Sequence, residues 1–223
     1  EKKIQTALPM KIIITTSLIF FLIVVCSCKN TTNLIKPKML KPGDTIGLVS
    51  PAGCVKNKQP IDQYKSTITA QLTALGFKVK FAPHWDDCWG YLAGTDQQRA
   101  DDLNNMFYDP NIDGILANRG GWGCARILPL LDYESIAKNP KIFVGFSDIT
   151  ACINAIHQQT GLVTFHGPVG IDTWAQDSID VEWTQKLLAS SAGTVAGLVL
   201  TNDERYQPEL HTITPGIANG TLV

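Results

Sequence analysis

The sequence predicts a doubly wound, flavodoxin- or Rossmann-like α/β domain with a parallel sheet, followed by the truncated start of a β-rich C-terminal domain. Short apolar runs alternate with helical patterns, and turn residues bound each run. After Gly170 the pattern changes to glycine-rich, β-prone segments, which indicates a second domain. We therefore expect upstream residues, leader and tether over 1–38, the α/β domain over 39–172, and a linker with an incomplete second domain over 173–223.

Five short segments are predicted as the strands of the sheet. Each is rich in apolar residues and is bounded by turn residues or by a predicted helix. Strands that alternate with helices in this way lie parallel, and the helices cover both faces of the sheet. The predicted strands are residues 45–50, 78–82, 114–117, 142–146 and 163–165.

Helices are predicted where apolar residues recur at three- and four-residue spacing. The clearest start is Thr95, which forms a capping-box sequence with Gln98. Gly76 and Gly161 are expected to end two of the helices. The predicted helices cover residues 60–75, 96–109, 125–131, 133–138, 148–160 and, beyond the first domain, 181–189.

The composition fits a globular protein that does not bind nucleic acid. Apolar residues make up 44% of the chain, which is ample for a core. The formal net charge is −1, and the basic residues are scattered. Because nucleic-acid binding needs a clustered basic surface, we expect no nucleic-acid partner.

The first thirty residues have the pattern of an export signal. Met10 and Lys11 precede an apolar stretch, Ile12 to Val25, that is shorter than the ~20 residues of a membrane span. Residues 25–28 resemble the lipobox of bacterial lipoproteins, which implies cleavage before Cys28 and lipidation of that cysteine. We therefore expect an exported lipoprotein, anchored in a membrane and facing the periplasm or cell wall.

Four of the six cysteines lie outside this leader. An exported compartment permits disulfides, but no C-x-x-C pair is present to indicate one. We therefore predict that these cysteines are small, buried, hydrophobic side chains, and we expect no metal site. They are Cys54, Cys88, Cys124 and Cys152.

A single serine stands where the fourth predicted strand turns into a helix. Gly145 and Ser147 match the first half of the nucleophile pattern G-x-S-x-G, but Ile149 replaces the second glycine. Two interpretations are open. Ser147 is either an exposed nucleophile, beside which the Asp148 amide faces developing negative charge, or a helix cap.

A glycine-rich segment, Arg119 to Gly123, follows the third predicted strand. Its glycines allow close approach of the backbone to a ligand and offer amide donors. The segment fits no dinucleotide fingerprint, because Arg126 stands in place of the last glycine, and the chain has no P-loop. The alternative interpretation is a sharp turn with Trp122 packed in the core.

Several ordered motifs, from about Met39 onward, resemble the LD-carboxypeptidase family of serine peptidases. Trp122 stands where that family usually has tyrosine or phenylalanine. The motifs are Leu40–Ile46 with Ser50–Gly53, Tyr91–Asp96 with Arg99 and Asp102-Leu103, Arg119–Gly123 with Arg126, Asn139–Lys141 leading into Gly145–Thr150, and Phe165–Pro168.

The resemblance implies a serine nucleophile, Ser147, with the amides of Asp148 and Gly121 as an oxyanion hole and with no cofactor. The implied reaction is hydrolysis of the L,D-amide bond that releases terminal D-alanine from murein tetrapeptides. The family's triad glutamate and histidine come from the C-terminal domain. We expect them beyond Val223, so that the chain as given would be inactive alone.

Four further residues are predicted to contact the murein peptide. Arg119 suits the free carboxylate of the substrate, because a guanidinium binds a carboxylate through two hydrogen bonds. The others are Gly120, Trp122 and His166. For Arg126 we favour a structural salt bridge, and for His84 a surface position. His157 lies about 15 Å along the helix from Ser147 and is excluded as its base.

Two other functions stay open at this point. One is a self-immunity peptidase of the same superfamily, which hydrolyses a peptidyl-nucleotide antibiotic. The other is a non-catalytic binding lipoprotein. Fold alone does not separate these functions. A homodimer is compatible with each of them.

Overall fold

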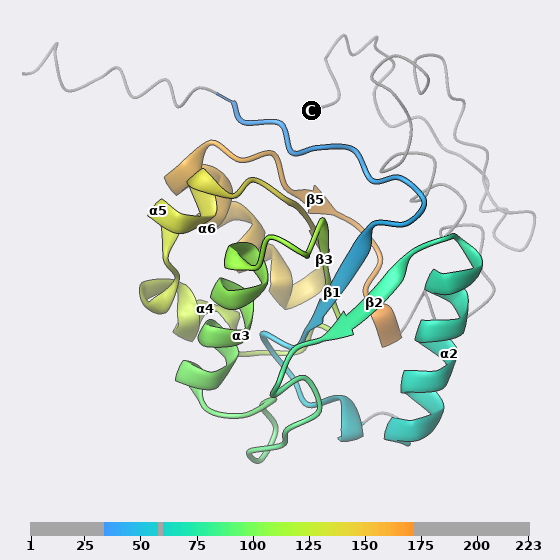
Figure 1. Cartoon of the computed structure of the whole chain (residues 1–223). Coiled ribbons are helices and arrows are strands. Elements are labelled where there is room, and N and C mark those ends of the chain that lie inside the picture. The colour runs from blue at the N-terminus through green and yellow to red at the C-terminus, as the bar shows by residue number, and fades with distance from the viewer. Residues whose placement is uncertain (1–33, 58–59, 172–223) are drawn as a thin grey trace, which may run out of the picture. The chain divides into compact units, whose positions relative to one another are not determined.

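The computed structural model describes residues 34–57 and 60–171, which form one α/β domain around a parallel sheet (Figure 1). The strand order is β2-β1-β3-β4-β5, and every neighbouring pair is parallel. This is the flavodoxin-type order of a doubly wound sheet, so the predicted fold class is confirmed. The strands are β1 (Thr45–Val49), β2 (Lys78–Phe81), β3 (Gly114–Ala117), β4 (Ile142–Gly145) and β5 (Phe165–His166).

The helices are divided between the two faces of the sheet. Figure 1 shows α2 beside β2, whereas α3 to α6 contact one another in a separate layer. Right-handed crossovers produce this division, because the chain moves one way from β1 to β2 and the opposite way from β2 to β3. The helices are α2 (Ile61–Ala74), α3 (Asp96–Tyr108), α4 (Cys124–Ile127), α5 (Tyr133–Lys138) and α6 (Thr150–Thr160).

The central strands form the core. Every residue of β3 and β4 is buried, as expected for strands that are covered on both faces. From the α3 layer, Phe107 packs edge-on against Phe143 of β4, with ring centroids 6.0 Å apart. On the α2 side, Tyr64, Ile68 and Leu72 are buried at helical spacing. Both edge strands, β2 and β5, keep partly exposed side chains.

The elements predicted within the described residues are all present, with three differences in their bounds. The helix predicted over 125–131 is split into α4 and a 3-10 turn, Leu128–Leu130, since Pro129 cannot continue an α-helix. The helix predicted over 148–160 begins as a 3-10 turn, Ser147–Ile149, before α6. The fifth strand begins two residues later and ends one residue later than predicted. The Thr95 capping box and the end of α6 at Gly161 are confirmed.

Part of the predicted tether pairs with the domain. The Ile35 amide donates to the Gly161 carbonyl at 2.8 Å, and the Val163 amide donates to the Ile35 carbonyl at 2.9 Å. The predicted leader with Cys28, the 181–189 helix and the β-prone segments after it lie outside the described residues. Among the described residues, no helix has both the length and the apolarity to cross a membrane.

Candidate active site

Ser147 lies at the tip of a sharp turn between β4 and α6. Its side chain is exposed, and its φ of +61° is the only positive value among the described non-glycine residues. The helix packs closely on the strand, because a Cβ on Gly145 would lie 2.6 Å from Cγ2 of Ile149. A serine in this region of φ costs roughly 1–3 kcal/mol, so the surrounding packing must enforce the turn. Nucleophilic serines are presented on strand-turn-helix geometry of this kind.

The alternative interpretation of Ser147 as a helix cap is wrong. The 3-10 turn has Phe146 at its cap position, and α6 has Ile149 there. Neither start is closed by a side-chain hydrogen bond. The strained conformation of Ser147 therefore needs another explanation than helix capping.

The glycine loop, residues 119–123, lies directly against this serine. A Cβ on Gly120 would lie 2.9 Å from Cβ of Ser147 and 3.1 Å from its Oγ, so a larger residue there would displace the serine. Gly121 is exposed and has a φ of +127°, which favours glycine. Trp122 is 60% exposed, so the interpretation that it packs in the core is wrong. The segments that carry the Gly121 and Asp148 amides therefore meet at Ser147.

The position of this contact agrees with the topology of the sheet. In a sheet of this strand order, the crevice between β1 and β3 is where the chain reverses its direction of winding, and ligands bind there at the carboxyl ends of the strands. The loops after β1 and β3 meet in this crevice, since the Gly53 amide donates to the Gly120 carbonyl at 3.3 Å. Ser147 follows β4, the strand next to β3.

Arg119, predicted to bind the substrate carboxylate, is only 5% exposed. Its Nη1 donates to the Cys54 carbonyl at 2.8 Å, and its Nη2 donates to the Tyr91 hydroxyl at 3.4 Å. The guanidinium also lies over the Tyr91 ring, 5.6 Å from its centroid. These contacts fix Arg119 between the loops that follow β1 and β2, and its role toward substrate stays a prediction.

Tyr91 is a neighbour of the site that the sequence analysis does not single out. A Cβ on Gly121 would lie 2.6 Å from the Tyr91 hydroxyl oxygen, so the tyrosine packs against the glycine loop. The ring is 49% exposed. The sequence could have indicated Tyr91, because the Tyr91–Asp96 motif follows the second strand and therefore lies at the carboxyl edge of the sheet.

Arg126 forms the salt bridge that we favoured for it. Its Nε and Nη2 bind the Asp96 carboxylate at 2.9 and 2.7 Å. The hydrogen bond from Arg126 is the main cause that lowers the pKa of Asp96, and the same contact raises the pKa of Arg126. The Arg126 guanidinium also lies 5.9 Å from the centroid of the Trp122 ring.

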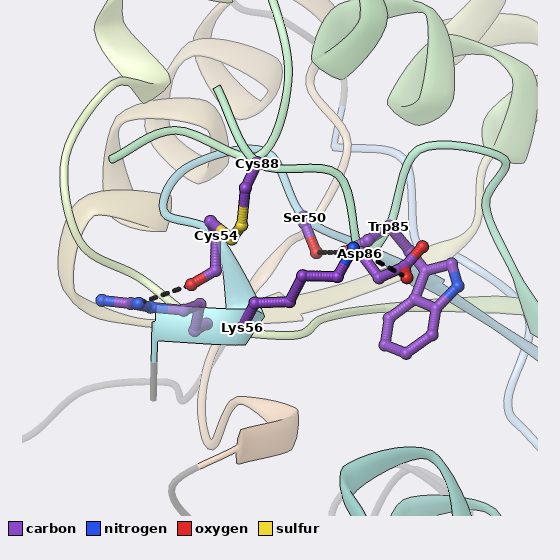
Figure 2. The surroundings of a disulfide bond; sticks show 7 residues. Ser50, Cys54, Lys56, Trp85, Asp86 and Cys88 are labelled. Atoms are coloured by element: carbon purple, nitrogen blue, oxygen red, sulfur yellow. Dashed lines mark hydrogen bonds and ion pairs between the residues drawn. A yellow bond between two sulfur atoms is a disulfide. The ribbon is translucent and has the colours of Figure 1, made fainter. Parts of the chain in front are cut away.

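Cys54 and Cys88 form a disulfide, so the prediction of buried thiols is wrong for this pair (Figure 2). Their Cα atoms are 5.3 Å apart, although 34 positions separate them in the sequence. Figure 2 shows the bond joining the loop after β1 to the loop after β2, with Lys56 directed toward Asp86. The disulfide therefore holds the loop whose Cys54 carbonyl binds Arg119.

A chain of buried hydrogen bonds lies beneath the same loops. The Tyr64 hydroxyl donates to Oδ1 of Asn118 at 2.6 Å, and Nδ2 of Asn118 donates to the Ser50 hydroxyl at 2.9 Å. Ser50 in turn donates to the Trp85 carbonyl. This network joins the ends of β1 and β3 to α2 and to the loop after β2.

For Cys124 and Cys152 the prediction of buried free thiols is confirmed. The hydrogen bond with Cys152, together with burial, raises the pKa of the Cys124 thiol far above its usual range. A buried, neutral thiol is a poor nucleophile, because the thiolate is the reactive form.

None of the histidines in the described residues forms a hydrogen bond with Ser147. His84 is half-buried instead of superficial, and its Nδ1 lies 2.9 Å from Oδ1 of Asp102. It follows β2, three strands from β4, which is roughly 14 Å at the usual strand spacing. His157 binds the Leu162 carbonyl at 2.9 Å. His166 is exposed on β5, where its ring meets Phe146 edge-on at 6.3 Å.

His166 is thus the histidine nearest to the serine turn among the described residues, since β5 pairs with β4 and His166 lies opposite Gly145. Its predicted place in the substrate pocket stays a prediction. Within residues 34–57 and 60–171, no three His, Cys, Asp or Glu side chains are grouped so that they could hold a metal ion.

Comparison with known proteins identifies close relatives of this domain. A probable murein peptide carboxypeptidase of Bacillus subtilis (strain 168) is 41% identical over 194 residues, which cover 84% of this chain and 56% of that protein. The murein tetrapeptide carboxypeptidase of Pseudomonas aeruginosa is 37% identical over 125 residues, which cover 56% of this chain and 39% of that protein. The chain therefore spans about half the length of the curated relatives it matches.

A solved structure has the same arrangement. The microcin C7 self-immunity protein MccF in its apo state matches with a TM-score of 0.66 and 31% sequence identity, over 71% of this chain and 48% of that one. The family model described as the LD-carboxypeptidase N-terminal domain (Peptidase_S66) matches residues 46–167. The serine turn, the glycine loop and the disulfide all lie within the matched residues, and the chain belongs to the LD-carboxypeptidase family.

Proposed function

We propose that this chain is the nucleophile domain of a serine LD-carboxypeptidase that releases terminal D-alanine from murein tetrapeptides. One observation carries the proposal: a strained, exposed serine, Ser147, stands in contact with the glycine loop at the carboxyl edge of the sheet. The names of the relatives from B. subtilis and P. aeruginosa support murein peptides as the substrate class.

The proposed reaction proceeds through an acyl-enzyme. The Ser147 Oγ attacks the carbonyl carbon of the residue before D-alanine, and its proton passes to a general base. The amides of Asp148 and Gly121 bind the oxyanion. As the intermediate collapses, the protonated base gives its proton to the nitrogen of D-alanine, so that the amide bond breaks and D-alanine leaves. Water then hydrolyses the ester. We propose that the base, a histidine oriented by a glutamate as the resemblance implies, comes from outside the described residues.

We further propose that the protein is exported and lipid-anchored. The apolar stretch from Ile12 to Val25 and the sequence before Cys28 support this. The disulfide between Cys54 and Cys88 supports it independently, because disulfides persist in oxidising compartments and are rare in the cytosol. Metabolic labelling with a palmitate analogue tests it, since the wild-type protein should incorporate the label and Cys28→Ala should not.

The hydrolase proposal is tested by D-alanine release from a murein tetrapeptide by the full-length protein. Ser147→Ala should lower the rate at least 10³-fold, the loss expected on removing a nucleophile. Ser66→Ala is the matched control, because Ser66 lies on the exposed side of α2 and should leave the rate unchanged. A serine-directed fluorophosphonate should label the wild type and Ser66→Ala, but not Ser147→Ala. Equal rates in all three proteins would refute the proposal.

The likeness to MccF favours a second candidate, a self-immunity peptidase. A peptidyl-nucleotide tests it in the same assay. Ser147-dependent cleavage of that compound in preference to the murein tetrapeptide would select this candidate. Unchanged ligand binding by Ser147→Ala, without labelling or cleavage by the wild type, would indicate a non-catalytic binding lipoprotein.

A further inference from the structure

One peptide group of the glycine loop is held at both ends by charged side chains. The carbonyl of Gly123 accepts a hydrogen bond from Nη1 of Arg99 at 3.1 Å. The amide on the other side of the same peptide plane, that of Cys124, donates to Oδ2 of Asp148 at 2.9 Å. Hydrogen bonds to charged groups are roughly twice as strong as neutral ones.

Asp148 connects this peptide to the serine turn. The residue directly follows Ser147, and its half-buried side chain turns toward the start of α4. Gly123 occupies the cap position of α4 and has no side chain to close it. Asp148 supplies the missing acceptor from a distant part of the chain, so the turn that carries the nucleophile also closes the helix after the glycine loop.

Arg99 connects the same peptide to the loop after β1. Its guanidinium is 1% exposed and donates from Nη1 to the carbonyl of Pro51 as well as to that of Gly123. Nη2 binds the Asp96 carboxylate, which balances the buried charge. Burying a guanidinium costs several kcal/mol unless it is paired in this way. One arginine therefore fixes the loops after β1 and β3 against each other.

The glycine loop needs such support. Gly121 and Gly123 both have positive φ values, and glycine has more backbone freedom than any other residue. An oxyanion hole works only if its amides are fixed within about 0.5 Å of the productive position before the reaction. The held peptide, 123–124, lies two residues after Gly121, so it limits the conformations that the loop carrying the Gly121 amide can adopt.

We infer that Arg99 and Asp148 are positioning residues that hold the glycine loop in register with Ser147. The Asp148 carboxylate thus acts in addition to the oxyanion role proposed for its amide. This inference rests on the proposed function. The two hydrogen bonds to the 123–124 peptide are the contacts that carry it.

Asp148→Ala tests the inference in the full-length protein. We expect kcat for D-alanine release to fall about 10- to 100-fold, part of the loss seen when an oxyanion-hole donor is removed. KM should change less than about 3-fold, since the substrate-binding walls stay in place. Asp148→Asn keeps an oxygen acceptor and should restore kcat to within about 3-fold of wild type.

Asp132→Ala is the matched control. Asp132 also accepts an amide at a helix start, that of Ser135 at 2.9 Å, but it closes α5, away from Ser147. Both alanine variants should lose similar stability, about 1 kcal/mol by the usual value of a cap, which thermal unfolding measures. Only Asp148→Ala should lower kcat. Equal kcat values in the two variants would overturn the inference.

Amide hydrogen exchange separates this inference from the proposed function. Exchange over Gly121 to Cys124 should be faster in Asp148→Ala than in the wild type or in Asp132→Ala. Unchanged exchange would refute the positioning role, whatever the enzymatic activity. Faster exchange together with Ser147-independent release of D-alanine would refute the proposed function and leave the positioning role intact.

Discussion

The polar contacts at the two edges of the parallel sheet differ in where they lie relative to Ser147. At the amino edge, polar groups connect the start of a strand to another strand or to the end of a helix, at the side of the sheet away from Ser147. Lys141 donates to carbonyls at the end of α3, and Asp113 accepts the Thr45 amide at 2.8 Å. At the carboxyl edge, polar groups connect one loop to another, as Arg99 does from Pro51 to Gly123. Substitutions at the amino edge should therefore change stability alone, whereas those at the carboxyl edge should change activity as well.

Gly120→Ala is expected to have the largest effect. The φ of Gly120 is not in the positive range that alanine avoids, so the new methyl group acts by displacing Ser147. We expect D-alanine release by the full-length protein to fall at least 100-fold, which is about 3 kcal/mol in the activation free energy.

A glycine of the amino edge gives the matching control. Gly43 has a φ of +97° but an open space where a Cβ would stand. Gly43→Ala should therefore cost about 1 kcal/mol of stability through backbone strain and leave kcat unchanged. If Gly120→Ala kept wild-type kcat, or if Gly43→Ala lost it, the comparison of the two edges would be wrong.

The sequence predicts local elements better than it predicts the contacts between loops at the carboxyl edge. The third strand and the helix over 133–138 lie where they were predicted, because apolar spacing and turn residues determine them locally. Ser147 was found in the same way, since the turn into α6 is local. The bounds of the fifth strand were predicted less well, because this strand pairs with β4 over only two residues at the edge of the sheet.

The missed features of the site depend on contacts between distant segments. No local pattern pairs Cys54 with Cys88, because strand order alone brings their loops together. For Asp148 the sequence predicts a role for the backbone amide but none for the side chain. The contact of that side chain with the Cys124 amide depends on how α6 packs against α4. Arg99 did carry a signal, since it shares the inward face of α3 with Leu103 and Met106 at helical spacing.

Removal of the disulfide is expected to affect activity less than Gly120→Ala does, but to have the largest effect on stability. The bond closes a long loop, which by chain entropy stabilises the folded state by about 3 to 4 kcal/mol. The double variant Cys54→Ser, Cys88→Ser should lower the free energy of unfolding by that amount in denaturant titrations. It should also raise KM, because the Cys54 carbonyl would no longer fix Arg119.

Reducing agent provides the control for the disulfide variant. Dithiothreitol should lower the stability of the wild type toward that of the double variant and should not affect the double variant itself. An unchanged wild type in the presence of reductant would show that the bond does not form. A loss of stability without any change in KM would show that the disulfide supports folding but not substrate binding through Arg119.

Lys141 gives a prediction for the amino edge. Burial lowers its pKa from 10.5 to about 8 in the folded protein. Between pH 8 and 10.5 the unfolded chain therefore binds more protons at this residue, and the free energy of unfolding should rise with pH. The contribution is roughly 3 kcal/mol over the whole window, and it is lost progressively as the pH falls from 10.5 to about 8.

Lys141→Met isolates this contribution, because other alkaline titrations cancel in the difference between the two proteins. The difference in unfolding free energy, wild type minus variant, should increase from pH 8 to pH 10. D-alanine release at a fixed pH should keep its wild-type kcat, as expected for an amino-edge residue. If the difference in unfolding free energy did not change with pH, the pKa of Lys141 would not be lowered in the folded protein, and the prediction would be wrong.

Thr95→Ala is expected to have the smallest effect. Thr95 lies at the carboxyl edge but caps a single helix, so this variant tests whether activity depends on the edge itself or on contacts between its loops. Its hydroxyl accepts the Gln98 amide at 3.2 Å, and Gln98 Oε1 accepts the Thr95 amide at 2.9 Å. Loss of the cap should cost about 1 kcal/mol in thermal unfolding, and Thr95→Ser should recover most of it. If contacts between loops support activity, kcat should stay within about 2-fold of wild type. A larger fall in kcat would mean that the start of α3, and with it Asp96 and Arg99, depends on this cap for its position.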